Sequence, residues 1–373
     1  MRTRARRAGR DKGFDRSSES TGDAERAGIP GGSGGFGGGA RAGLPGGAGS
    51  DRPRRLYADS GLPDRLFRTV AVSGGGVVLA VMLLVGGFLL YRAWQALRKA
   101  GWSFLTTAAW EPDAGHFGIA AVITGTCLIA AVAVVVAVPL ALGTALYISE
   151  YAPPRLRRTL VSVVDLMAAV PSVVYGLWGL FFLQGKVIGL ARWISTYLGW
   201  IPLFKVDGSD PHDPLATPTV YTASTFVAGL VVAMMVTPII CSVIREVFSQ
   251  APVGEREGAY ALGATRWGMI RSVVLPFAKG GIIGGTMLGL GRALGETIGV
   301  YLVISPIFKV QPHILQSGTS SVSSLIALRY GDATKMGMSA LMAAGLALFV
   351  ITLVVNFAAS SIVARSRSGA TAE

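Results

Sequence analysis

The sequence predicts an all-α integral membrane protein built as a bundle of six transmembrane helices. Hydrophobic residues make up 51% of the 373-residue chain and charged residues only 15%, a balance typical of proteins that contact lipid over much of their surface. Apolar runs long enough to cross about 30 Å of hydrocarbon recur along the chain. The alternating apolar and polar pattern of a membrane β-barrel is absent, so the spans are expected to be helices.

Six apolar runs define the predicted spans. Each is too long and too poor in charge for a helix in the core of a soluble protein. The predicted spans lie near 69–91, 119–147, 159–184, 219–244, 281–305 and 338–363. With their loops they form one predicted transmembrane domain, residues 66–365, followed by a short cytoplasmic tail, 366–373. The mixed stretch 187–200 after the third run is typical of an interfacial helix.

Residues 1–65 differ in composition from the rest of the chain. They are rich in Gly and Arg, and residues 31–49 alone contain eleven glycines. Such a segment has too few apolar side chains to offset the entropy lost on ordering its backbone. We therefore predict a disordered cytoplasmic tail. Weak attraction of its arginines to anionic lipid and a misassigned start codon both stay open.

Basic residues predict how the spans are oriented, because loops rich in Lys and Arg stay in the cytoplasm. The basic residues are dense in the N-terminal tail and in one alternate set of loops, 148–158 and 245–280, and in the segment after Ala364. Both termini are therefore predicted to be cytoplasmic. Most of the net charge of +13 reflects this bias, and we expect no nucleic-acid partner.

The chain contains few of the residue patterns that enzymes and metal sites require. Cys127 and Cys241 fall inside apolar runs without metal-ligand spacing, and no G-x4-G-K-[ST] phosphate loop is present. We predict that the chain is not an enzyme, has no metal site and binds no cofactor. Asp165, near the end of the third run, is expected to make a local hydrogen bond or ion pair rather than to couple ions.

A polar segment between the fourth and fifth runs, residues 249–280, carries the most informative pattern in the chain. A short helix around 251–262 is expected to break at Gly263, where a residue without Cβ can turn the chain. An amphipathic segment is expected to follow as far as Pro276. The residues that define the pattern are Glu257, Gly258, Ala259, Gly263, Leu275 and Pro276.

This spacing resembles the EAA loop of the permease subunits of bacterial ATP-binding-cassette importers, E-A-A-x3-G-x9-I-x-L-P. Gly258 stands at an Ala position of that pattern and Val273 at its Ile position. The resemblance implies a six-helix bundle of the importer-permease type. It also implies that residues 249–280 form a coupling loop that docks into a groove on a separate ATPase subunit. The alternative interpretation is an ordinary basic cytoplasmic loop.

The fifth run, 281–305, contains an arginine and a glutamate four residues apart. Arg292 and Glu296 would share one face of a continuous helix. Because an Arg near mid-membrane costs roughly 2.5–3.5 kcal/mol on insertion scales, the pair is expected to face protein or a water-filled path. Two interpretations stay open. Glu296 neutralises Arg292 in a structural ion pair, or Arg292 offers donors to an oxyanion while Glu296 holds it in place.

The run LGLGRALGET, residues 288–297, is similar to the permease subunit of bacterial phosphate importers, the PstC family. Stretches including FGIAAVITGT and DLMAAVPSVVYGLWGL are also similar, and the resemblance covers about residues 65–365. In that family the corresponding residues are implicated in phosphate passage, which implies a substrate pathway at Arg292 and Glu296. The resemblance places the chain in a bacterial plasma membrane as a multi-pass protein.

The same resemblance implies partners. These are a PstA-like sister permease, a pair of PstB-like ATPase subunits that use ATP and Mg, and a PstS-like extracytoplasmic phosphate-binding protein, with membrane lipid around the bundle. Three alternatives stay open. The substrate is another oxyanion such as sulfate or molybdate, the chain is an ion-coupled secondary transporter or channel, or it is a sensory scaffold that reports phosphate status.

Overall fold

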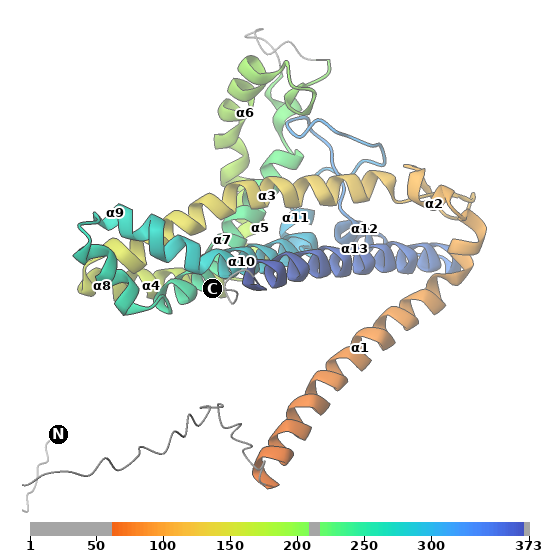
Figure 1. Cartoon of the computed structure of the whole chain (residues 1–373). Helices are drawn as coiled ribbons and strands as arrows, with labels where there is room; N and C mark the ends of the chain where they lie inside the picture. The colour runs from red at the N-terminus through yellow and green to blue at the C-terminus, as the bar shows by residue number, and fades with distance from the viewer. Residues whose placement is uncertain (1–61, 209–216, 369–373) are drawn as a thin grey trace, which may run out of the picture. The chain divides into compact units, whose positions relative to one another are not determined.

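Long apolar helices make up most of the chain that the structure, a computed structural model, describes: residues 62–208 and 217–368 (Figure 1). The predicted tail 1–65 and the end of the predicted tail 366–373 lie largely outside these residues. Within them six helical segments are long and apolar enough to cross a membrane, and this confirms the predicted six-helix bundle. They are Asp64–Ala100, Ala120–Tyr151, Ser172–Leu198, Thr225–Ser249, Arg266–Leu294 and Lys335–Ala358.

Several of these spans are assembled from shorter helices. The first half of the chain contains α1 (Leu62–Ala100), α2 (Ser103–Thr106), the antiparallel strands β1 (Trp110–Glu111) and β2 (His116–Phe117), α3 (Ala120–Leu146), the π-helix η1 (Tyr147–Tyr151), α4 (Pro154–Ala169), α5 (Ser172–Trp178), the π-helix η2 (Gly179–Leu183), α6 (Gln184–Leu198) and the short 3-10 turns η3 (Pro202–Phe204) and η4 (Pro218–Tyr221). The second half contains α7 (Thr225–Ser249), α8 (Val253–Ala261), α9 (Arg266–Met269), the π-helix η5 (Ile270–Val274), α10 (Leu275–Leu294), α11 (Ile298–Tyr301), α12 (Val322–Arg329) and α13 (Lys335–Ser368).

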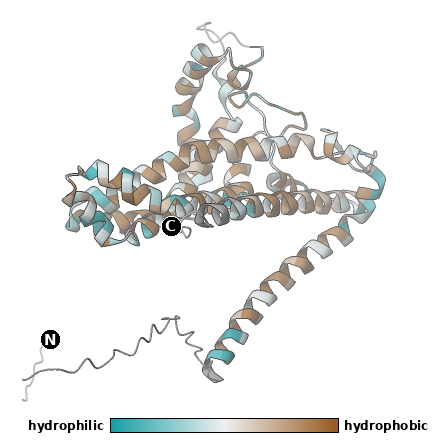
Figure 2. Cartoon of the chain, viewed as in Figure 1, coloured by the Kyte–Doolittle hydropathy of each residue, from teal (hydrophilic) through white to brown (hydrophobic). Residues whose placement is uncertain are grey.

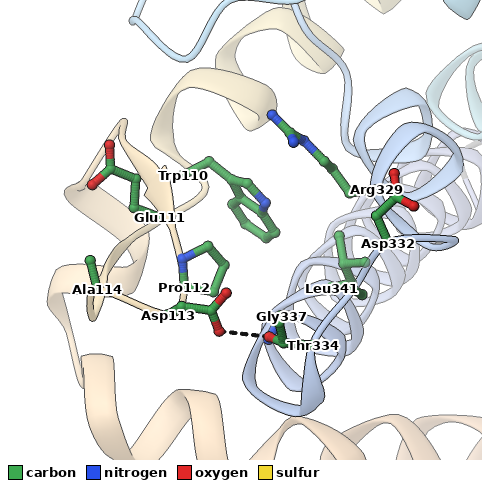
Figure 3. Close-up of a pocket in the computed structure, with 11 residues that line it drawn as sticks. Trp110, Glu111, Pro112, Asp113, Ala114, Arg329, Asp332, Thr334, Gly337 and Leu341 are labelled. Atoms are coloured by element: carbon green, nitrogen blue, oxygen red, sulfur yellow. Dashed lines mark hydrogen bonds between the residues drawn. The ribbon is translucent and has the colours of Figure 1, made fainter.

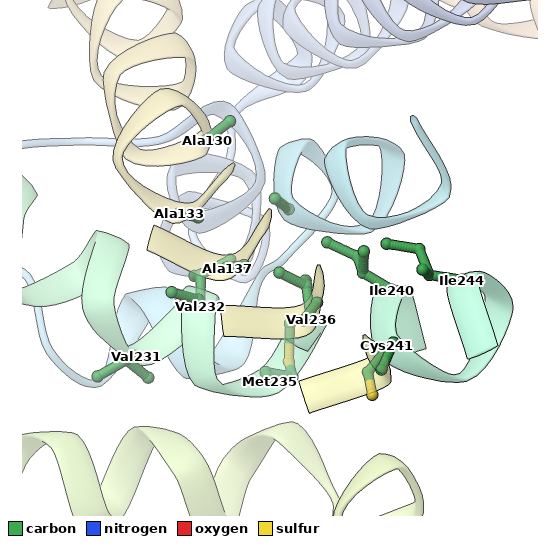
Figure 4. Packing of buried hydrophobic residues seen from close by; sticks show 14 of the residues in the cluster. Ala130, Ala133, Ala137, Val231, Val232, Met235, Val236, Ile240, Cys241 and Ile244 are labelled. Carbon is green, nitrogen blue, oxygen red and sulfur yellow. The ribbon is translucent and has the colours of Figure 1, made fainter. Parts of the chain in front are cut away.

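The core of the bundle lies where α3 and α7 pack along their length. Ala133, Ala137 and Ala141 recur every four residues on α3 and are fully buried, and Figure 4 shows the first two facing the valines of α7. The approach is close, since a Cβ built on Gly229 would collide with a methyl group of Val132. Small residues at such positions let two membrane helices pack backbone against backbone.

The third predicted span, 159–184, differs from the observed one. Helix α4 ends at Ala169, Val170 is extended (φ −64°, ψ 129°), and a new helix starts after Pro171. The cause is local, because a residue before proline is disfavoured in the helical region and proline itself has no N–H to donate. The span therefore runs from Ser172 to Leu198, and it includes most of the stretch that was predicted to be an interfacial helix.

The fifth predicted span, 281–305, also differs. Its helix begins well before the apolar run, at Arg266, and ends at Leu294, where Gly295 forms the cap. After this break only the single turn α11 follows. Glycine has the lowest helix propensity of any residue except proline. The helix therefore stops at Gly295, although the residues that follow are mostly apolar.

Helix α1 packs chiefly against α13, near the end of α1 that precedes α2. Ala93 and Ala96 are fully buried against α13 together with Leu341 and Ala344. Residues 64–85 of α1 are exposed, and apolar residues recur along this part of the helix (Figure 2). In a membrane protein this surface is one for lipid or a partner helix rather than for water.

Candidate functional site

Arg292 lies in the last turn of α10, directly before the break in the fifth span, and its side chain is exposed. Among the residues that the structure describes, none forms a hydrogen bond or ion pair with this side chain. Its positive charge at the carboxyl end of a helix is favoured by the helix dipole.

Glu296 occupies a different environment, in the turn that joins α10 to α11. Its side chain is buried, with 9% of the residue exposed, and its Oε1 accepts a hydrogen bond of 3.0 Å from the backbone N–H of Gly299. Its backbone oxygen accepts a 2.6 Å hydrogen bond from the hydroxyl of Ser323. Glu296 thus secures the start of α11 and ties it to α12.

The expectation that Arg292 and Glu296 share one helical face is wrong, and the structural ion pair, one of the two open interpretations, does not form. Their four-residue spacing would bring them together only on a continuous helix, whereas α10 ends between them at Leu294. The ion pairs among the described residues do not include this one. The two residues instead lie in separate environments. Arg292 is exposed, and Glu296 is buried against the start of α11.

The break in the fifth span lies against the break in the third. Helix α5, which starts after Pro171, packs on α11, and a Cβ built on Gly176 would lie 2.9 Å from the Cα of Gly299. The hydroxyl of Tyr175 donates a 2.8 Å hydrogen bond across the first break to the carbonyl of Met167. Freed backbone groups at membrane depth are tolerated where protein satisfies them or where they line a cavity, and discontinuous helices commonly build transport sites.

A buried group of hydroxyls adjoins this meeting point. Ser321 caps the start of α12 and exchanges hydrogen bonds with Ser324, whose side chain reaches back to the N–H of Ser321. The next backbone N–H, that of Val322, donates to the hydroxyl of Thr126 on α3 at 3.0 Å. The first half of α12 is packed into the bundle, where its serines satisfy their own helix end.

The segment between α7 and α10 has the predicted helix–turn–helix form. Helix α8 ends before Gly263, whose φ of +83° places it in the left-handed region, and Thr265 caps α9 by accepting the N–H of Gly268 at 3.1 Å. We call residues 253–269, which comprise α8, this turn and α9, the knob. The predicted break at Gly263 is confirmed, and its cause is the one argued from the sequence.

The residues of the EAA pattern divide into two groups. Glu257, Gly258 and Pro276 are exposed, whereas Ala259 and Leu275 are half-buried against the main core. The turn also presents large apolar side chains outward, and Leu262 beside Gly263 is 91% exposed. An exposed apolar patch in an otherwise polar segment marks an interaction surface.

Two further features lie away from Arg292. Asp165 pairs with Arg245 of α7 at 3.8 Å, which confirms the local ion pair expected for this aspartate. A cavity of about 370 Å³ lies between the β1–β2 hairpin and the turn from α12 to α13, where Figure 3 shows Asp113 accepting a 2.6 Å hydrogen bond from Thr334. The described residues contain no group of three or more His, Cys, Asp or Glu suited to a metal ion.

Residues 137–368 match the sequence model of the family described as the inner membrane component of binding-protein-dependent transport systems. This match covers the spans from the middle of α3 to the end of α13, together with the knob and the break at Gly295. The class of protein is therefore a membrane-embedded transport permease, one that works with a binding protein and an ATPase.

The relatives narrow this class. The phosphate transport system permease protein PstC 2 of Mycobacterium tuberculosis is 38% identical over 303 residues, covering 80% of this chain and 91% of the relative. The phosphate transport system permease protein PstC of Xylella fastidiosa is 36% identical over 293 residues, covering 78% and 88%. The chain belongs to the PstC permeases of the binding-protein-dependent transport family, and it is a multi-pass protein of the plasma membrane.

Solved structures agree on the fold. A chain of a bacterial alginate importer in complex with its alginate-bound periplasmic protein superposes with a TM-score of 0.54 at 18% identity, covering 81% of this chain and 95% of that one. A second structure of a bacterial alginate importer gives a TM-score of 0.50 at 19% identity, with 81% and 99% covered. At this level of identity the likeness concerns the fold alone.

Proposed function

We propose that the chain forms half of the transmembrane pathway of an ATP-driven phosphate importer and that Arg292 contacts phosphate on its way through. The observation that carries the proposal is the exposed Arg292 side chain, which forms no hydrogen bond or ion pair with the described residues, in a chain whose relatives are named phosphate transport permeases. The sister half of the pathway would come from a PstA-like permease.

Arginine suits this task chemically. Its guanidinium is planar, permanently charged and able to donate two parallel hydrogen bonds to a tetrahedral oxyanion. An unpaired Arg within a membrane span is costly, and an anion passing beside it offsets that cost. Glu296 supports the site indirectly, because it fixes the break that ends α10 directly after Arg292.

The fifth span supplies a mechanical link between the knob and this arginine. Helical backbone runs without interruption from Arg266, at the start of α9, to Leu294, a distance of about 40 Å at 1.5 Å per residue. Displacement of the knob by a partner is therefore transmitted along one helix to the turn that carries Arg292. The exposed Leu262 and Glu257 of the knob are the surface that a PstB-like ATPase would contact, and ATP and Mg would be used there.

The proposed orientation of the chain indicates on which side of the membrane each partner subunit would bind. The knob and both termini face the cytoplasm in the proposed orientation, and the β1–β2 hairpin and the α12–α13 turn face outward. A PstS-like protein would deliver phosphate to that outer side. The chain itself would perform no catalysis and hold no cofactor.

The decisive experiment measures uptake of labelled phosphate in cells that lack their own high-affinity importer and express this chain with its partner subunits. Arg292→Ala is compared with Arg292→Lys and with Arg68→Ala, a control that removes an exposed arginine from α1. We expect uptake to collapse in Arg292→Ala, to recover in part in Arg292→Lys because the charge remains, and to be normal in the control.

Excess sulfate and molybdate are added as competitors in the same assay. Uptake that resists both supports phosphate as the substrate, whereas loss of uptake with either assigns the pathway to another oxyanion. Normal uptake by a fully inserted Arg292→Ala chain would refute the role of this arginine. Transport by the chain without an ATPase would instead favour an ion-coupled transporter.

A further inference from the structure

One ion pair fastens the knob to the end of the second span. Arg256 of α8 places Nη1 at 3.1 and 3.2 Å from the two carboxylate oxygens of Glu150, which lies in the π-helical turn η1 that follows α3. The side chain of Glu150 is only 5% exposed and that of Arg256 21%. A charged pair that is this well covered is screened far less than one at the surface.

Arg256 also reaches a third segment. Its Nη2 donates a hydrogen bond to the backbone oxygen of Phe248, in the last turn of α7, and Phe248 is fully buried. Ser149 completes the shell by donating to Oε1 of Glu150. One guanidinium therefore joins the knob to the ends of both the second and the fourth spans.

The other arm of the knob contacts the same turn. Arg266, the first residue of α9, lies with its guanidinium carbon 5.4 Å from the centre of the Tyr151 ring, and Tyr151 is the last residue of η1. Both α8 and α9 thus meet η1, one through an ion pair and one through a cation–π contact. Single π-helical turns within α-helices are frequent at functional sites.

The connectivity of the chain explains why this contact matters. The fourth and fifth spans are covalently continuous with the knob, through α7 to α8 and through α9 to α10. The second span is not covalently continuous with the knob, and along its length it packs against α7 through alanines and larger apolar side chains. The Arg256–Glu150 pair joins the end of the second span to the knob and fixes the position of that span along its own axis.

We propose that Arg256 is a positioning residue that transmits movement of the knob to the second span, through Glu150. This inference rests on the proposed function, in which an ATPase moves the knob. It assigns Arg256 a role inside the permease, directed at the bundle, that is separate from the outward contacts of the neighbouring Glu257. When the pair is absent, the knob still docks, but its movement reaches the fourth and fifth spans without the second.

The test uses the complete complex, with permeases, ATPase and binding protein, reconstituted in proteoliposomes. ATP hydrolysis and phosphate transport are measured on the same sample for Glu150→Gln, Arg256→Gln and the double variant. Gln keeps most of the side-chain volume and removes the charge. Arg155→Gln, which changes an exposed arginine of α4, is the control.

We expect each single variant to keep the ATPase bound and to transport about fivefold less phosphate per ATP hydrolysed. The double variant should be no worse than either single one, because the two residues act as one contact. The control should match the wild type.

Three outcomes overturn the inference. Unchanged phosphate-to-ATP ratios in the single variants show that the pair transmits nothing. Additive losses in the double variant show that the residues act separately. Loss of the ATPase from the purified variants shows that the pair only shapes the docking surface. A wild-type complex that neither retains an ATPase nor transports phosphate would refute the proposed function itself.

Discussion

The contact between the two broken spans predicts a large effect from a single methyl group. In Gly176→Ala the new Cβ would lie 2.9 Å from the Cα of Gly299, 3.0 Å from a methyl of Leu302 and 3.1 Å from the carbonyl oxygen of Gly299. Two of these atoms belong to backbone, which cannot rotate away as a flexible side chain can. Helices α5 and α11 must therefore separate by about half an ångström or more to restore ordinary contact distances.

The expected cost is about 1–3 kcal/mol, the range measured when a methyl group is forced into a well-packed interior. The displacement falls next to Glu296, whose carboxylate accepts from the Gly299 N–H, so we also expect transport to fall. Gly185→Ala is the matched control, since it lies in the same span with nothing within 4 Å of its Cβ, and the change should be neutral or slightly stabilising.

The assay combines thermal unfolding of the purified complex with phosphate uptake in cells at equal expression. Gly176→Ala should unfold at a lower temperature and transport less than Gly185→Ala. Equal unfolding temperatures and equal uptake for the two variants would refute the reasoning, because the close approach of α5 and α11 would then carry no energetic or functional weight.

Three further predictions concern the turn, the break and an outer loop. Gly263→Ala should weaken retention of the ATPase, because Gly263 has a positive φ and a residue with a Cβ pays about 1–2 kcal/mol to adopt it. Gly258→Ala should not weaken retention, because a Cβ built at that position contacts nothing. Glu296→Ala should lower the free energy of unfolding by about 1–3 kcal/mol, as measured by thermal unfolding. Glu296→Gln keeps an acceptor oxygen and should lower it less. Equal losses in the two variants would contradict the role of Glu296 as a cap. A hydrogen bond from Lys205 and the charge of that lysine lower the pKa of Asp207. The contact between the two side chains therefore stabilises the fold at neutral pH, and this stabilisation is lost as the pH falls through the lowered pKa. Asp207→Asn should remove this part of the pH dependence of unfolding, and an unchanged pH dependence in the variant would contradict the prediction.

The number of spans and the shape of the knob could be predicted from the sequence because local features determine them. Apolar runs of sufficient length form membrane helices whatever their neighbours are, and Gly263 turns the chain because of its own conformational freedom. The ion pair expected for Asp165 is confirmed for a similar reason, because a carboxylate near the end of a span is stabilised by a nearby cation, here Arg245.

The two breaks were missed because a search for apolar length averages over the interruptions. Pro171 and Gly295 were both visible in the sequence, but each lies within a run whose hydropathy continues past it. The hydrogen bonds at the start of α12 could not be predicted from the sequence for another reason. Its serine hydroxyls satisfy one another and the helix end inside the bundle. Which polar groups find internal partners is decided by tertiary packing, and spacing alone does not reveal it.

The separation of Arg292 from Glu296 changes how Arg292 would act in the proposed transport function. Had the two formed an ion pair on one helix, the arginine would have been neutralised within its own subunit and an anion would have had to displace a carboxylate. With Glu296 engaged by α11 and α12, Arg292 stays available at the tip of a helix that starts in the knob. In the proposed function, movement of the knob would therefore change the position of the arginine without first breaking an ion pair.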